Sequence, residues 1–193
     1  MSCFCIPNPK TVVIRKVSQF YLPTFHDWVD GYAVAMHEKS SQVFITRGND
    51  LFVYNLKRMI WSKGPSLNQA RTHHSSICLG STVYVIGGLN AYSVEALDLA
   101  SETVYWKVIA SGYHFKRSNS ALAVLDKHRI AIIGGLYCNT WYKHNACIIF
   151  DTKHCTHEVV PCDDSDFIFS CVSDTWYVGG NKFITLGKDL DEE

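Results

Sequence analysis

The chain has 193 residues, and its 18 Lys and Arg side chains balance 18 Asp and Glu side chains, so it carries no net formal charge. Hydrophobic residues make up 47% of the sequence and aromatic residues 13%, which allows a sizeable buried core and predicts one globular domain over residues 1–193. A neutral chain has no long-range field for nucleic acid or an anionic membrane, and no apolar run reaches the roughly eighteen residues of a membrane span, so neither partner is expected.

The N-terminal residues MSCFCIPNPK lack the charged start and apolar centre of a secretory leader. The eight cysteines are scattered, and Cys78 lies inside an apolar run, SSICLG. Small buried thiols of this kind are typical of reduced cysteines, so we expect a cytoplasmic protein. Residues 10–17, KTVVIRKV, form the first predicted strand.

A short apolar stretch that ends in glycine recurs four times along the chain, as VFITRGND, VYVIGGLN, IAIIGGLY and TWYVGGNK. Arg47 replaces the first glycine in the first copy, and the other copies carry the pairs Gly87 with Gly88, Gly134 with Gly135, and Gly179 with Gly180. The second glycines, Gly48, Gly88, Gly135 and Gly180, are separated by 40, 47 and 45 residues. This period lies within the range of propeller repeats.

Other residues recur with the glycines. Trp61 follows Tyr54 by seven residues and Trp106 follows Leu97 by nine, whereas the third copy carries His157 at the tryptophan position. Before the glycines, Arg71 with His74 in the second copy matches Arg117 with Ser120 in the third. These residues therefore belong to the repeat.

Short runs rich in Val, Ile, Tyr and Phe, bounded by turn residues, predict β-strands, and no helical period is sustained. Each repeat is predicted to be a four-stranded antiparallel sheet that hides its apolar faces only by packing on the next sheet. The predicted blades span 26–66, 67–112 and 113–162, and an incomplete fourth spans 163–193. The strand at 10–17 is expected to complete the fourth blade and close the ring.

On these glycines, tryptophans and the Arg71–His74 pair, the chain resembles the kelch family of β-propellers. The resemblance implies an all-β propeller of about four blades, fewer than the family leads us to expect, as a small closed ring or a partial propeller. An open propeller would expose the apolar flanks of its end blades and would self-associate.

In a meander of antiparallel strands, the connections after the second and fourth strands emerge on one side. In this chain those connections are rich in aromatic and cationic residues, which dominate protein interfaces. The predicted partner-binding residues are Tyr92, Tyr113, His114, Phe115, Arg117, Tyr137, Trp141 and Tyr142. Trp141 and Tyr142 are the expected anchors, and the alternative for each residue is packing into a neighbouring blade.

We predict no catalytic residue, no metal and no cofactor. His154, Cys155, His157 and Cys162 lack the ligand spacing of a zinc site, and Asp163, Asp164 and Asp166 fit a solvated turn better than a cation site. No nucleophile elbow, phosphate-binding loop or dinucleotide fingerprint occurs.

The sequence thus favours a noncatalytic scaffold that binds a protein or peptide. The kelch resemblance implies a ubiquitin-ligase substrate receptor or a cytoskeletal, actin-binding adaptor. Two alternatives stay open. One is a propeller enzyme similar to sugar oxidases, epimerases or metal-dependent specifier proteins. The other is a degenerate, truncated kelch paralogue.

Overall fold

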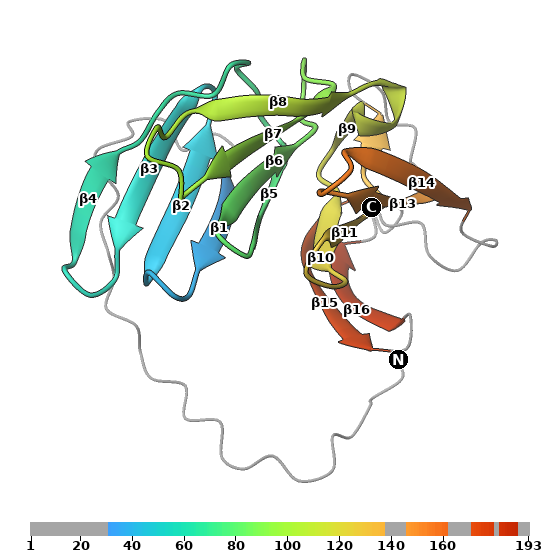
Figure 1. Cartoon of the computed structure of the whole chain (residues 1–193). Helices are drawn as coiled ribbons and strands as arrows, with labels where there is room; N and C mark the ends of the chain where they lie inside the picture. Colours follow the sequence, from blue (N-terminus) through green and yellow to red (C-terminus); the bar gives the residue numbers. More distant parts are fainter. Residues whose placement is uncertain (1–30, 138–145, 162–170, 180–181, 189–193) are drawn as a thin grey trace, which may run out of the picture.

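The computed structural model describes residues 31–137, 146–161, 171–179 and 182–188 (Figure 1). The regular secondary structure of these residues is almost entirely β-strand, and their only helical element is a 3-10 turn at Tyr113–Phe115. The predicted all-β class is therefore confirmed. Within the described ranges, no helix is long and apolar enough to cross a membrane.

Three four-stranded antiparallel sheets and one strand pair follow each other in chain order. Sheet A consists of β1 (Ala33–His37), β2 (Gln42–Arg47), β3 (Asp50–Asn55) and β4 (Ile60–Lys63). Sheet B consists of β5 (Ser75–Leu79), β6 (Thr82–Ile86), β7 (Ser93–Asp98) and β8 (Trp106–Ser111). Sheet C consists of β10 (Ala121–Val124), β11 (Arg129–Ile133), β13 (Ala146–Asp151) and β14 (Thr156–Pro161).

Pair D consists of β15 (Cys171–Gly179) and β16 (Lys182–Lys188). A short ladder of β9 (Arg117–Ser118) with β12 (Leu136–Tyr137) stands beside sheet C. The sheets fall one by one within the residue ranges predicted for the blades. The strand predicted at 10–17 and Gly180 lie outside the described residues.

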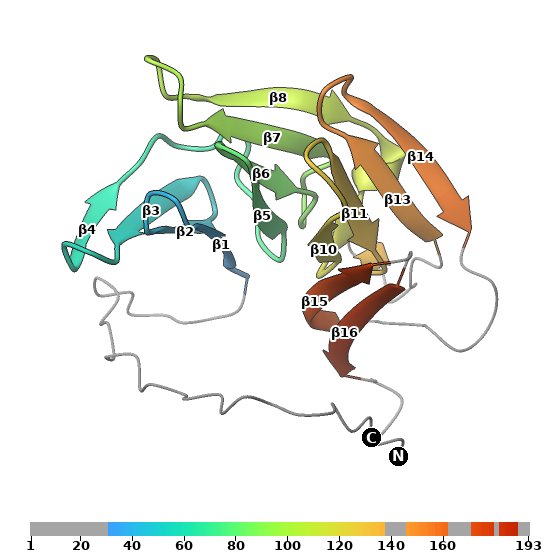
Figure 2. The ribbon, with the colours of Figure 1, turned by 60° about the horizontal axis from the view of Figure 1, so that its bottom comes forward.

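The sheets are arranged along an arc with their first strands on its inner side (Figure 2). The first strand of sheet B, β5, lies beside both β1 and β10, and β10 lies beside β15. The last strands β4, β8 and β14 lie on the outer side of the arc. Neighbouring sheets therefore lie side by side along the arc, with their first strands adjacent.

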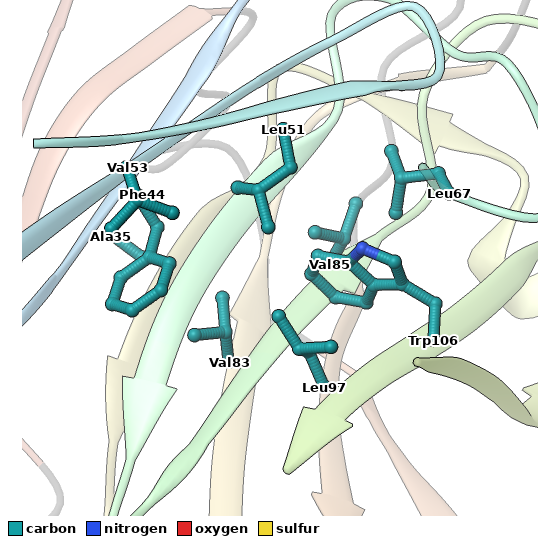
Figure 3. Packing of buried hydrophobic residues seen from close by; sticks show 9 residues of the cluster. All are labelled: Ala35, Phe44, Leu51, Val53, Leu67, Val83, Val85, Leu97 and Trp106. Atoms are coloured by element: carbon teal, nitrogen blue, oxygen red, sulfur yellow. The ribbon is translucent and has the colours of Figure 1, made fainter. Parts of the chain in front are cut away.

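Two hydrophobic cores fill the spaces between the sheets. Between sheets A and B, Figure 3 shows the cluster of Ala35, Phe44, Leu51, Val53, Leu67, Val83, Val85, Leu97 and Trp106. Between sheets B and C, the cluster contains Leu79, Tyr84, Ile86, Val94, Phe115, Ile130, Ile132, Ile148 and Phe150. Because sheet B has a neighbour on each side, four consecutive residues of β6, Val83–Ile86, are buried.

Strand register defines equivalent positions in the three sheets. The first strands place Ala33, Ser75 and Ala121 opposite Thr46, Ile86 and Ile133. Each of these opposite residues directly precedes the glycine position of its repeat, so Gly48, Gly88 and Gly135 are equivalent, as the sequence spacing indicates. On the outer strands, the matching pairs are Tyr54 with Trp61, Leu97 with Trp106, and Phe150 with His157.

The second glycine of each pair lies against the strand entry of its own sheet. A Cβ atom at Gly88 would come within 2.8 Å of the Thr72 carbonyl oxygen, and one at Gly135 within 2.8 Å of the Ser118 carbonyl oxygen. Both glycines also have positive φ, +103° and +92°. Only glycine combines this backbone conformation with so close an approach, which explains why the residue recurs.

Candidate partner-binding face

The connections after second and fourth strands meet on one side of the arc, which we call the loop face. In the described chain it comprises residues 48–49, 64–74, 87–92, 112–120 and 134–137. Backbone hydrogen bonds join these connections: Arg71 N–H donates to the Gly48 carbonyl at 3.0 Å, and Gly88 N–H donates to the Arg117 carbonyl at 2.8 Å. The loop face is therefore built from segments fixed across neighbouring sheets.

Arg71 lies buried beneath the loop face with a complete set of acceptors. Its Nη1 donates to the carbonyl oxygens of Gly87 and Ser93 at 2.9 and 3.0 Å, and its Nη2 donates to Glu95 Oε1 at 2.5 Å. Glu95 also accepts hydrogen bonds from the backbone N–H groups of Asn68 and Gln69. Both charged side chains have no exposed surface. This network holds the entry loop of sheet B to the glycine turn.

Arg117 repeats that arrangement in sheet C, and its prediction as a partner-binding residue needs correction. The side chain is buried, and its Nη1 donates to the carbonyl oxygens of Gly134 and Ala146 at 3.0 and 3.3 Å. These acceptors are the equivalents of Gly87 and Ser93 around Arg71. Arg117 therefore secures a turn and presents no charge to a partner.

Phe115, another predicted partner-binding residue, does not lie on the surface. Its side chain is fully buried in the core between sheets B and C, where its ring meets Phe150 edge to face at a centroid distance of 5.7 Å. Leu67 inserts from the preceding connection into the core between sheets A and B in the same way. Phe115 thus fills a core position, as the alternative of blade packing anticipated.

The neighbouring aromatic residues of the 3-10 turn are accessible. Tyr113 is 62% exposed, and its ring lies 5.5 Å from the ring of Tyr137, measured between centroids. Hydrogen bonding with the Tyr113 side chain, together with burial, raises the pKa of Tyr137. The two phenol rings therefore form one continuous aromatic surface.

His114 extends this surface towards the outer strand of sheet C. Its ring lies 5.0 Å from the ring of His157, which also contacts Phe115 at 5.2 Å. Burial and the neighbouring His114 lower the pKa of His157. In sheet B the equivalent residue, Trp106, is buried and donates its indole N–H to the Pro65 carbonyl at 3.0 Å. Replacing tryptophan by histidine therefore leaves a more polar and more open position beside the loop face.

Tyr92 lies in the glycine turn of sheet B. It is 40% exposed, Lys116 Nζ lies 5.0 Å above its ring centroid, and its carbonyl accepts a hydrogen bond from Gly112 N–H at 2.9 Å. A cation over a tyrosine face is favourable at exposed sites by about 0.5–1 kcal/mol. Tyr92, Tyr113, Tyr137, His114 and Lys116 together form what we call the aromatic patch.

The loop face carries no acidic side chain in its described residues. Its cations are Lys116 and the buried Arg117, while the charge of the buried Arg71 is paired with Glu95. The connections on the opposite side carry both signs, with the acids Glu38, Glu102 and Asp126 and the bases Lys39, Lys57, Arg58, Lys127 and Lys153. The loop face therefore differs from the opposite side in that its described residues include no carboxylate.

Reactive side chains in the described chain are not collected into a recognisable chemical site. Within these residues, no group of three or more His, Cys, Asp or Glu side chains could hold a metal ion. Burial raises the pKa of Cys78 to about 12, so its thiol is a poor nucleophile. Burial, with Arg71 and His73 nearby, lowers the pKa of His74 to about 3. His74 Nε2 instead lies 2.6 Å from Thr46 Oγ1, a hydrogen bond that joins sheets A and B.

Several predicted residues lie outside the described chain, namely Trp141, Tyr142, Cys162, Asp163, Asp164 and Asp166. Of the remaining metal candidates, His154 Nδ1 pairs with Asp151 Oδ2 at 2.9 Å and Cys155 is exposed. Sequence reasoning missed Glu95, the buried partner of Arg71. The position of Glu95 in the middle of the strand SVEALD, between apolar residues, was the available signal, because a buried carboxylate requires a partner.

No protein-family model matches the chain, and no curated protein matches it.

Proposed function

We propose that the protein is a kelch-type β-propeller that acts as a noncatalytic scaffold and binds a protein or peptide on the aromatic patch. The observation that carries this proposal is the exposure of Tyr92 and Tyr113 on loops that cross-sheet hydrogen bonds hold in place. Exposed tyrosines on a rigid base bind with little loss of conformational entropy.

The charge pattern defines the chemistry of the proposed partner. A loop face whose described residues include no carboxylate, with Lys116 Nζ over the ring of Tyr92, favours a peptide that carries Asp or Glu. The tyrosine rings provide the apolar contact area and their hydroxyls donate hydrogen bonds to carboxylate oxygens. Because Cys78 and Cys155 are free thiols in the described chain, we propose that the scaffold acts in the cytoplasm.

The test is a selection of random peptides against the full chain, followed by Kd measurements by fluorescence polarisation. Selected peptides are expected to be enriched in acidic residues, and their affinity should fall as salt rises. Tyr113→Ala combined with Tyr137→Ala should weaken binding at least tenfold, since central aromatic residues commonly contribute more than 1 kcal/mol each.

A matched control comes from the opposite side of the arc. Tyr105 is 52% exposed, and Lys107 Nζ lies 5.0 Å above its ring centroid, as Lys116 does above Tyr92. Tyr105→Ala should leave the affinity unchanged. Equal losses for Tyr105→Ala and for the double substitution would overturn the assignment of the aromatic patch.

A further inference from the structure

Sheet A presents an outward side that has the residue pattern of a packed interface. On β1 and β2 this side consists of Val34, Met36, Val43 and Ile45, which we call the end face. The opposite side of sheet A, with Ala35 and Phe44, packs into the core against sheet B. The end face is thus the side of sheet A that points away from the rest of the arc.

Strand register identifies the equivalents of these residues in sheets B and C. Val43 and Ile45 correspond to Val83 and Val85 in sheet B, which are fully buried against sheet A. In sheet C they correspond to Ile130 and Ile132, which are fully buried against sheet B. At these positions, sheets B and C each pack against the sheet that precedes them in the chain.

The residues of the first strands also have equivalents in the other sheets, but their exposure differs. Met36 is equivalent to Cys78, which packs against the core between sheets A and B. Val34 is equivalent to Leu122, which packs against the core between sheets B and C. Val34 and Met36, however, are 47% and 51% exposed. Sheet A therefore has apolar residues at the positions where sheets B and C pack against a preceding sheet. No described sheet, however, covers its first strand.

We propose that the end face binds a second copy of this chain, whose pair D docks on β1 and β2. Pair D lies beside β10 at the far end of the arc (Figure 2). Sheets B and C each pack on the sheet that precedes them, and pair D is the last of the series. Pair D of one copy can therefore take the place of the sheet that would precede sheet A in another copy. A surface and its complement at opposite ends of one arc make a head-to-tail contact.

Two such contacts close when the copies are related by a two-fold axis. Four sheets in each chain then give eight in the pair, at the upper end of the roughly four to eight blades of known propellers. Closure covers the exposed apolar strip of Val34 and Met36 on each β1, next to Ile45, which is already buried. This inference concerns sheet packing and is independent of the aromatic patch.

Sedimentation equilibrium of the full chain at several concentrations tests the proposal. The expected result is a mass of two chains, and Val34→Glu with Met36→Glu should shift the dissociation constant at least a hundredfold towards monomer. Because both side chains are exposed, this variant should keep the wild-type circular dichroism. Val108→Glu on β8, which is 53% exposed, is the control and should stay dimeric. A wild-type mass of one chain, or a dimer indifferent to the end-face variant, would overturn the proposal.

A cross-link identifies the docked segment directly. A photoreactive phenylalanine analogue at position 36 is introduced into a mixture of isotopically light and heavy chains. The proposal predicts light-to-heavy cross-links that map to 171–188. Cross-links to that segment found only within chains of one isotope would show that pair D reaches its own sheet A, and would contradict docking of a second copy.

Discussion

The backbone N–H of Asn119 donates to the carbonyl oxygen of His73 at 2.8 Å, and both residues have positive φ, +53° and +55°. They are equivalent positions, two residues after Arg117 and Arg71. His73 N–H in turn donates to the Gly31 carbonyl at 3.2 Å, and Gly31 has a φ of +113°. One backbone link thus recurs from sheet to sheet on the inner side of the arc, where it sets the spacing of the sheets.

Replacing the recurrent glycine should destabilise the protein according to its surroundings. Gly88→Ala should lower the free energy of unfolding by about 2 kcal/mol or more, because its Cβ would meet the Thr72 carbonyl and the His74 side chain at a strained φ. Gly48→Ala is the control. It has positive φ but no atom within 4 Å, so it should cost only about 1 kcal/mol in urea unfolding. Equal losses at the two positions would contradict the close-approach explanation.

The buried pair of Arg71 and Glu95 should be strongly coupled. Arg71→Ala and Glu95→Ala should each cost about 3–5 kcal/mol, because each leaves a buried charge without its partner. The double substitution should cost clearly less than the sum. Lys63 and Asp50 form an exposed pair at 2.8 Å, so Lys63→Ala should cost less than about 1 kcal/mol. Additive losses at Arg71 and Glu95 would show that the network does not act as a unit.

Stability should fall with acidification through His74. Its pKa is about 3 in the folded protein and about 6.5 in an unfolded chain, so only the unfolded state takes up a proton between these values. The native state keeps its full stability above pH 6.5 and loses up to about 1.4 kcal/mol per pH unit below it. His74→Ser, which introduces the residue found at the equivalent Ser120, should flatten this part of the pH profile. If the difference in the free energy of unfolding between the wild type and this variant did not change between pH 4 and 6.5, the assignment would be refuted.

Thiol reactivity should separate the described cysteines. Cys78, with a pKa raised to about 12 by burial, should react with iodoacetamide at pH 8 far more slowly than the exposed Cys155. Mass spectrometry of the native protein gives both rates. Similar rates under native conditions, and not only in denaturant, would mean that Cys78 is not packed between sheets A and B.

The positions of the repeat residues could be predicted from the sequence more accurately than the residues of the partner-binding surface. Backbone strain and sheet register fix the sequence spacing of equivalent residues from one repeat to the next. This spacing reveals the glycine pairs and the residues paired with Trp61, Trp106 and His157. Phe115 and Arg117 were assigned to the surface because residue type alone does not separate a core aromatic, or an arginine bonded to carbonyls, from an interface residue. The positive φ of His73 also had no signal of its own. Only alignment of its copy with Asn119, a residue that tolerates this conformation, reveals the position.

Hydrogen exchange of the full chain, with and without a selected acidic peptide, tests the binding assignment most directly. We predict slower exchange of amides in residues 87–92 and 112–117, with no change in residues 99–105 on the opposite side. Protection confined to 99–105 and 125–128, with the loop face unaffected, would contradict it.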